Sequence, residues 1–178
     1  MDRVGYTAMT AAHRSMLSLQ VHANNLANAN TPGFRADLER AQAVAVQGYG
    51  YDSRHLALVG NAGVNLAPGP LVATGRDLDV AIQGEGLFVV EYGDGEAYTR
   101  HGSLQLDADG RLTINGRQVM GEGGPIVVPP HERISIGRDG VISIKPVGEN
   151  DMVELERLRL VRAPAAELTK NADGLLVR

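Results

Sequence analysis

Apolar residues near the start of the chain recur three and four residues apart, which is the pattern of a helix with a narrow contact seam. No strong helix breaker except Gly5 interrupts the sequence from Asp2 to about Asn28. A helix of that span would be about 40 Å long at about 1.5 Å per residue. The predicted seam consists of Met9, Ala12, Met16, Leu19, Ala23 and Leu26.

The end of this expected helix is rich in asparagine, a mediocre helix former whose amide competes for nearby backbone groups. Pro32 disfavours helix at Thr31, and Gly33 permits a left-handed turn, so the helix should end near residues 28–30. At a helix end surrounded by other helices, the amides can bridge to exposed carbonyls or to neighbouring chains. The asparagines therefore predict a crowded environment at the helix end.

A seam this narrow suits another helix better than a sheet, and no second stretch of the sequence predicts a helix of similar length. A lone helix with an apolar stripe is marginal in water, because most helical stability comes from packing. We therefore expect the partner to come from another chain or from sequence outside residues 1–178. The alternative is that the helix packs on the β domain of its own chain.

The second half of the chain has a different apolar period, which changes from about 3.6 to 2 and predicts strands. Short alternating runs are separated by turn sequences, of which Asn115-Gly116 is the best. A type I′ turn needs positive φ at both central residues, which Asn and Gly tolerate. The predicted class is α+β, with a long N-terminal helix that carries a coiled-coil-like seam, followed by an irregular, mostly antiparallel β domain.

These patterns divide the chain into three expected segments. Residues 1–35 form the helix and its asparagine-rich end, which together make an assembly segment. Residues 36–66 form a linker of irregular structure. Residues 67–178 form an antiparallel β domain of about eight to ten short strands, judged by the usual spacing of turns.

Composition and short motifs exclude several kinds of protein. The net charge of −4 argues against a nucleic-acid binder, which usually carries a basic surface. The absence of cysteine removes disulfides and thiolate zinc sites. The longest apolar runs are too short to span a bilayer, and the first residues lack the apolar region of a cleaved secretory signal. We therefore expect no membrane insertion, and export, if any, by another route.

The sequence predicts no catalytic, cofactor-binding or metal-binding residues. Residues 107–111 approach a calcium loop, but the spacing of Gly110 is wrong, so a hairpin turn is expected. The five histidines are dispersed, which does not favour metal ligation. We therefore expect a protein that is not an enzyme and needs no cofactor.

Other candidate catalytic groups have simpler interpretations. Asp77 and Asp79 would point to the same face of a strand, whereas a glycosidase needs two carboxylates held across a cleft. Arg76 would pair with Asp77 at the surface, where an ion pair contributes little. Ser103 is expected at a strand edge and not as a nucleophile, because no nucleophile-elbow motif surrounds it.

Residues 23–35, ANNLANANTPGFR, resemble the signature of bacterial flagellar basal-body rod proteins, an axial family that also includes the hook. Residues 1–12, 68–90, 98–129 and 134–144 are similar to the proximal rod members in order and spacing, and residues 158–176 resemble the segment that follows. The motif positions are Asn24, Asn25, Leu26, Ala27, Asn28, Thr31, Pro32, Gly33 and Phe34.

The resemblance implies a structural subunit that polymerises helically into the periplasmic rod, which carries torque from motor to hook. Its implied partners are itself, other flagellar rod proteins and the flagellar type III export apparatus, which takes it from the cytoplasm without a cleaved signal. In this family the N-terminal helix pairs with a long C-terminal helix. Nothing similar to that helix lies within residues 1–178, so the missing helix is the expected partner of the seam.

Three alternatives remain open at the level of sequence. A distal rod or other axial-family subunit would share the same motifs, although a hook protein should carry a further outer domain. A free β-rich module that binds peptidoglycan would tolerate the loss of residues 1–35. A cell-wall hydrolase would require a cleft that holds a carboxylate pair with perturbed pKa values.

Overall fold

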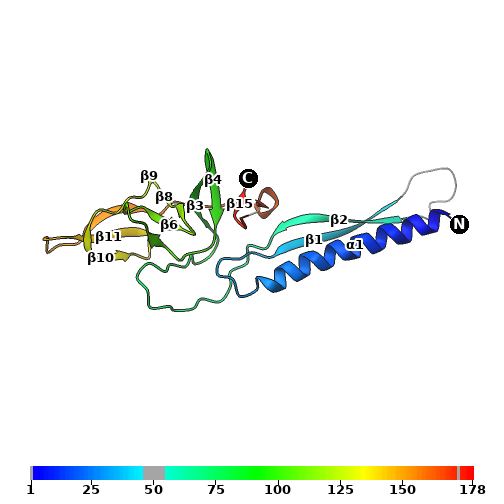
Figure 1. Ribbon diagram of the computed structural model, residues 1–178, viewed down its shortest axis with the longest axis horizontal. Coiled ribbons are helices and arrows are strands. Elements are labelled where there is room, and N and C mark those ends of the chain that lie inside the picture. The colour runs from blue at the N-terminus through cyan, green and yellow to red at the C-terminus, as the bar shows by residue number, and fades with distance from the viewer. Residues whose placement is uncertain (1, 46–54, 172) are drawn as a thin grey trace. The chain divides into compact units, whose positions relative to one another are not determined.

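The computed structural model describes residues 2–45, 55–171 and 173–178 (Figure 1). The chain forms two compact units. Unit 1 consists of Met1–Thr31 and Arg35–Asn65, and unit 2 consists of Pro32–Phe34 and Leu66–Arg178. The predicted α+β class is confirmed, because a long N-terminal helix is followed by antiparallel strands.

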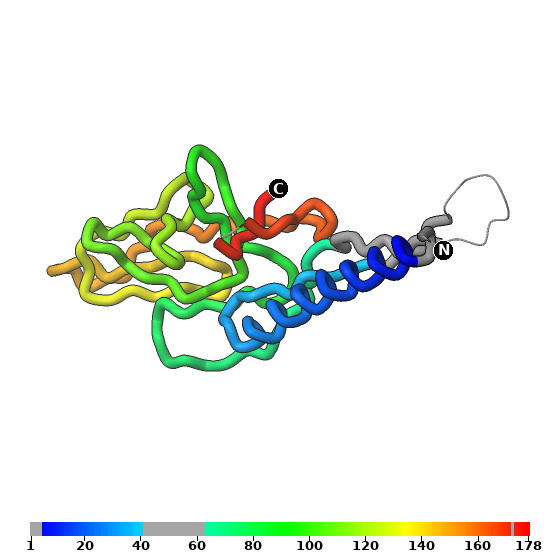
Figure 2. The backbone as a smooth tube through the Cα atoms, turned by 45° about the vertical axis from the view of Figure 1, so that its right-hand side comes forward, coloured from blue at the N-terminus to red at the C-terminus, as the bar shows by residue number. Residues whose placement is uncertain are grey.

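Unit 1 contains the helix α1 (Asp2–Ala27) and a hairpin of two antiparallel strands, β1 (Asp37–Ala45) and β2 (His55–Val64). Figure 1 shows the hairpin running alongside α1, and Figure 2 shows the same helix, in blue, from a second direction. The linker of irregular structure expected for residues 36–66 needs correction, because β1 and β2 lie within it. The strand register shifts between Leu38 and Glu39, because their partners Gly63 and Asn61 leave one extra residue on β2.

The helix end lies close to its predicted position. α1 ends at Ala27, and the N–H of Asn28 still donates to the carbonyl of Asn24 at 3.1 Å. The N–H of Ala29 then bonds to the Leu26 carbonyl, a tighter spacing that is common where helices end. Gly33 has φ of 74°, which confirms the left-handed turn.

Unit 2 contains small antiparallel sheets. Its largest sheet has the strand order β13-β3-β4-β15-β14, and β10-β11-β12, β5-β6-β7 and β8-β9 form the others. The bounds are β3 (Leu87–Tyr92), β4 (Gly95–Thr99), β5 (Gln105–Leu106), β6 (Leu112–Ile114), β7 (Arg117–Gln118), β8 (Met120–Gly121), β9 (Gly124–Pro125), β10 (His131–Ile136), β11 (Val141–Pro146), β12 (Val153–Arg157), β13 (Leu160–Val161), the 3₁₀ turn η1 (Ala165–Glu167), β14 (Thr169–Lys170) and β15 (Leu176–Val177).

The core of unit 2 is made by alternating residues of these strands. Val90 of β3, Leu112 and Ile114 of β6, and Ile142 and Ile144 of β11 are buried in one apolar cluster. On β11 the intervening residues are half-buried, as expected for a strand with one face on a core. The cluster also contains Phe88, Ala97, Leu104, Val119, Ile126, Val128, Ile134, Leu158 and Leu175.

Two turns of unit 2 follow the sequence prediction. Asn115 and Gly116 have φ of 51° and 75° and join Ile114 to its strand partner Arg117, which confirms the type I′ turn. Residues 107–111 form the turn between β5 and β6, as predicted. The carboxylate of Asp107 stabilises this turn by accepting bonds from the N–H groups of residues 109 and 111 at 2.9 and 2.8 Å.

Candidate assembly surface

The predicted seam of α1 is exposed within the subunit. Met9, Met16, Leu19 and Leu26 have 64%, 64%, 67% and 78% of their surface exposed. Ala12 and Ala23 are exposed as well. The methionines and leucines are large apolar side chains in a regular row. A subunit that stays single in solution rarely exposes such a row.

The opposite stripe of α1 is half-buried and mostly polar. At about 100° per residue this stripe lies roughly 180° around the helix from the seam. Two hydrogen-bonded contacts tie it to the hairpin: the hydroxyl of Ser18 donates to the carboxylate of Glu39 at 2.6 Å, and Asn25 bonds to Asp37. The stripe consists of Thr10, Arg14, Ser18, Val21, Asn25 and Asn28. α1 therefore uses its polar face inside the subunit and presents its apolar face outward.

Asn25 pairs with the first residue of β1 through two hydrogen bonds. Its Nδ2 donates to the Asp37 carbonyl, and its Oδ1 accepts from the Asp37 N–H, both at 3.0 Å. Residues in paired antiparallel strands exchange the same two kinds of bond. The sequence interpretation assigns the asparagine amides to exposed carbonyls at the helix end or to neighbouring chains. It misses this partner of Asn25, because no local pattern links positions 25 and 37.

The other asparagines differ from Asn25 in their surroundings. The amide of Asn28 donates to the Asn24 carbonyl at 3.0 Å, and its oxygen accepts from the hydroxyl of Thr31 at 3.3 Å. Asn28 therefore satisfies groups at the helix end, which is a known use of asparagine. The side chain of Asn24 is exposed. Of the remaining motif positions, Leu26 lies in the seam and residues 32–34 belong to unit 2.

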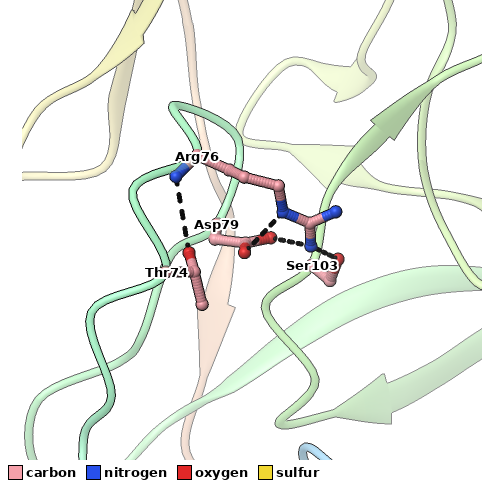
Figure 3. A network of polar contacts seen from close by, with 4 residues as sticks. All are labelled: Thr74, Arg76, Asp79 and Ser103. Atoms are coloured by element: carbon pink, nitrogen blue, oxygen red, sulfur yellow. Dashed lines mark hydrogen bonds and ion pairs between the residues drawn. The ribbon is translucent and has the colours of Figure 1, made fainter.

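A polar network in unit 2 involves two of the groups considered as catalytic candidates (Figure 3). Arg76 donates to both carboxylate oxygens of Asp79 at 2.8 and 2.6 Å, and to the hydroxyl of Ser103 at 2.7 Å. The expected pairing of Arg76 with Asp77 is therefore wrong. Asp77 lies in a turn and Asp79 makes an isolated bridge with Ser103, so the two aspartates do not share a strand face.

The electrostatics of this network do not suit acid–base catalysis. The hydrogen bonds from Arg76, and then from Thr74, lower the pKa of Asp79 to about 2. A general acid near neutral pH needs a raised pKa instead. Among the residues that the structure describes, no group of three or more histidine or acidic side chains is placed to hold a metal ion. No helix in the described ranges is long and apolar enough to cross a membrane.

Comparison with known proteins decides to which family the chain belongs. A sequence model described as flagella basal body rod protein matches residues 6–35, and one described as the flagellar hook protein FlgE/F/G D1 domain matches residues 81–144. The chain is 46% identical over 178 residues to flagellar basal-body rod protein FlgF of Salmonella typhimurium, covering 98% of this chain and 71% of that protein. FlgF of Escherichia coli is 44% identical with the same coverage.

The chain belongs to the flagellar basal-body rod protein family. Flagellar basal-body rod protein FlgG of Bacillus subtilis is also similar, with 34% identity over 156 residues that cover 78% of this chain and 59% of that protein. As a basal-body rod protein, the chain is a structural protein and not an enzyme. The rod model covers α1 from residue 6 and continues through its asparagine-rich end to residue 35, and the hook-type model lies within unit 2.

Proposed function

We propose that this chain polymerises helically with itself and with other rod proteins, and that its α1 seam is the surface that neighbouring helices cover. The exposed apolar row opposite a polar, hydrogen-bonded face supports this proposal most directly. The resulting rod would act as the periplasmic drive shaft that transmits torque from the motor to the hook. Delivery by the flagellar type III export apparatus, without a cleaved signal, completes the proposal.

Burial of the seam would contribute favourable free energy to association. Met16, Leu19 and Leu26 are about two thirds exposed or more in the subunit. Full burial of such a side chain contributes about 1.5–3 kcal/mol, so each one retains about 1–2 kcal/mol for assembly. Summed over these three side chains, the burial free energy exceeds the side-chain entropy lost on contact. The same gain is repeated in every subunit.

The proximal part of the rod is the proposed location of this subunit. The FlgF relatives are 46% and 44% identical to the chain, whereas the FlgG relative of Bacillus subtilis is 34% identical. Both names denote basal-body rod proteins, so a distal rod subunit is the nearest alternative. In a distal rod subunit, neighbouring helices would cover the same seam of α1.

Substitution of the seam tests the assembly role. A triple variant, Met16→Gln with Leu19→Gln and Leu26→Gln, should export and fold normally but fail to enter purified basal bodies. Tyr6→Gln with Leu17→Gln is the matched control, because both residues are exposed apolar residues of α1 outside the seam. Normal incorporation of the triple variant, or equal failure of the control, would show that the seam is not the assembly surface.

A further inference from the structure

The three residues Pro32–Phe34 pack with unit 2, although Thr31 before them and Arg35 after them belong to unit 1. The chain therefore leaves unit 1 after the helix end, touches unit 2 for three residues and returns to start the hairpin. We propose that Pro32–Phe34 is a docking segment by which unit 2 holds the chain just after α1, with Gly33 and His101 as its positioning residues.

Gly33 fits against the backbone of His101 more closely than any other residue could. A Cβ atom at position 33 would lie 2.4 Å from the His101 nitrogen and 2.5 Å from its Cα. Contacts below 3.0 Å essentially never occur for real Cβ atoms. Since the obstacle is backbone, it cannot rotate away as a flexible side chain would. The docking segment thus requires glycine for space as well as for its φ of 74°.

Phe34 provides the second contact of the docking segment. The ammonium group of Lys170 lies over the Phe34 ring, 4.1 Å from its centre. A cation at this distance is attracted by the negative face of the ring. Lys170 belongs to β14, which pairs with β15 in the five-stranded sheet. The ring is therefore held by the main sheet of unit 2 and not by a peripheral loop.

The part of unit 2 that receives Gly33 is held in place on both sides of His101. Arg100 donates to the carbonyls of Gly86 at 2.7 Å and Ile82 at 3.1 Å, and also to that of Gly84. Gly102 lies so close to Val80 that a Cβ there would be 1.6 Å from the Val80 oxygen. The segment 100–102 therefore cannot shift easily to make room for a larger residue at position 33.

His101 is held at its own backbone and within the packed surface. Its N–H donates to the hydroxyl of Thr99 at 3.1 Å. Its ring is half-buried, and this burial lowers the pKa of His101. The same burial disfavours the charged imidazolium, because a charge is costly to remove from water.

The docking involves residues of one subunit only and lies within unit 2, so it does not depend on the proposed function as a rod subunit.

A single tryptophan can report the docking, because the chain contains none. In the soluble full chain, Phe34→Trp should be shielded from acrylamide by its contact with unit 2. Adding Gly33→Ala should raise acrylamide quenching severalfold. Adding Gly75→Ala is the matched control, because Gly75 has φ of 75° but a Cβ added there would meet no heavy atom within 4 Å. Unchanged quenching in the Gly33→Ala protein, or an equal rise in the control, would overturn the proposal.

Hydrogen exchange provides a second measurement that keeps the native Phe34. Gly33→Ala should increase exchange of the amides of residues 99–102 by about tenfold, which reports local opening, while Gly75→Ala should leave them unchanged. Lys170→Met should give a smaller increase, because it removes only the cation. Unaltered exchange in the Gly33→Ala protein would refute the docking. A seam variant that still builds rods would instead refute the assembly role and leave the docking intact.

Discussion

Replacing Asn25 with alanine should loosen the hairpin of unit 1 although alanine is the better helix former. The substitution removes both bonds between the Asn25 amide and the backbone of Asp37. Each such bond contributes about 0.5–1.5 kcal/mol net, so the loss is about 1–3 kcal/mol. The gain in helix propensity is at most about 0.7 kcal/mol. The net effect is a weakening of about 0.5–2 kcal/mol.

Asn24→Ala is the matched control, because the neighbouring Asn24 side chain is exposed on the same helix. This control gains the same propensity and should leave the hairpin as it is or stabilise α1. Hydrogen exchange of the amides in β1 and β2 should be about 2- to 30-fold faster in the Asn25→Ala protein, since 1.4 kcal/mol is a factor of ten. In the Asn24→Ala protein the exchange rate should not increase.

In a peptide that spans residues 1–35, the expected effect of Asn25→Ala has the opposite sign, so the peptide provides a second test. It lacks Asp37, so Asn25→Ala should raise its helicity by circular dichroism, as Asn24→Ala should. Equal hairpin exchange in the two full-length variants would refute the role assigned to Asn25. The asparagine would then act only as a helix stop signal, and the hairpin would be held by other contacts.

Two further predictions concern unit 2. Because the pKa of Asp79 is lowered to about 2 from 3.8, its ionised form stabilises the fold above pH 4, and this contribution should be lost as the pH falls from 4 to 2. Thermal melting of Asp79→Asn should accordingly show a weaker pH dependence between pH 5 and 2; an unchanged dependence would contradict the pairing with Arg76. Asn115→Ala should lower the urea stability by about 1 kcal/mol, because φ of 51° is unfavourable for alanine, whereas Asn115→Gly should be nearly neutral. Equal losses in the two variants would argue against backbone conformation as the cause.

The sequence predicts the features that depend on local periodicity and local turn chemistry. The helix is expected from Asp2 to about Asn28 and extends to Ala27, because its apolar spacing and the Pro32-Gly33 break both lie in one short stretch. The Asn115-Gly116 turn is predictable for the same reason, since its φ values follow from two adjacent residues. Such features need no knowledge of distant contacts.

The features that the sequence does not reveal depend on contacts between distant residues or on interrupted patterns. The hairpin of β1 and β2 is hidden by an alanine-rich first strand with weak β propensity. The bonds from Asn25 to Asp37 and from Arg76 to Ser103 join residues 12 and 27 positions apart. The docking of Gly33 on His101 carries no local signal other than the glycine itself. The assembly role of the seam stays a prediction until a variant is tested.

In the proposed assembly, the sizes of the seam residues would also restrict how far a partner helix can slide along α1. Ala12 and Ala23 leave two hollows in a row of bulky side chains, and they lie about 16 Å apart along α1 at about 1.5 Å per residue. A partner must bring bulky side chains to both hollows at once. A shift by one helical turn, about 5.4 Å, would place large residues against large ones and open gaps beside the alanines. The steric profile of the seam would thus fix the axial offset between neighbouring subunits without any charge pair, so that filling either hollow by Ala12→Leu or Ala23→Leu would alter the spacing of the assembly and not merely its strength.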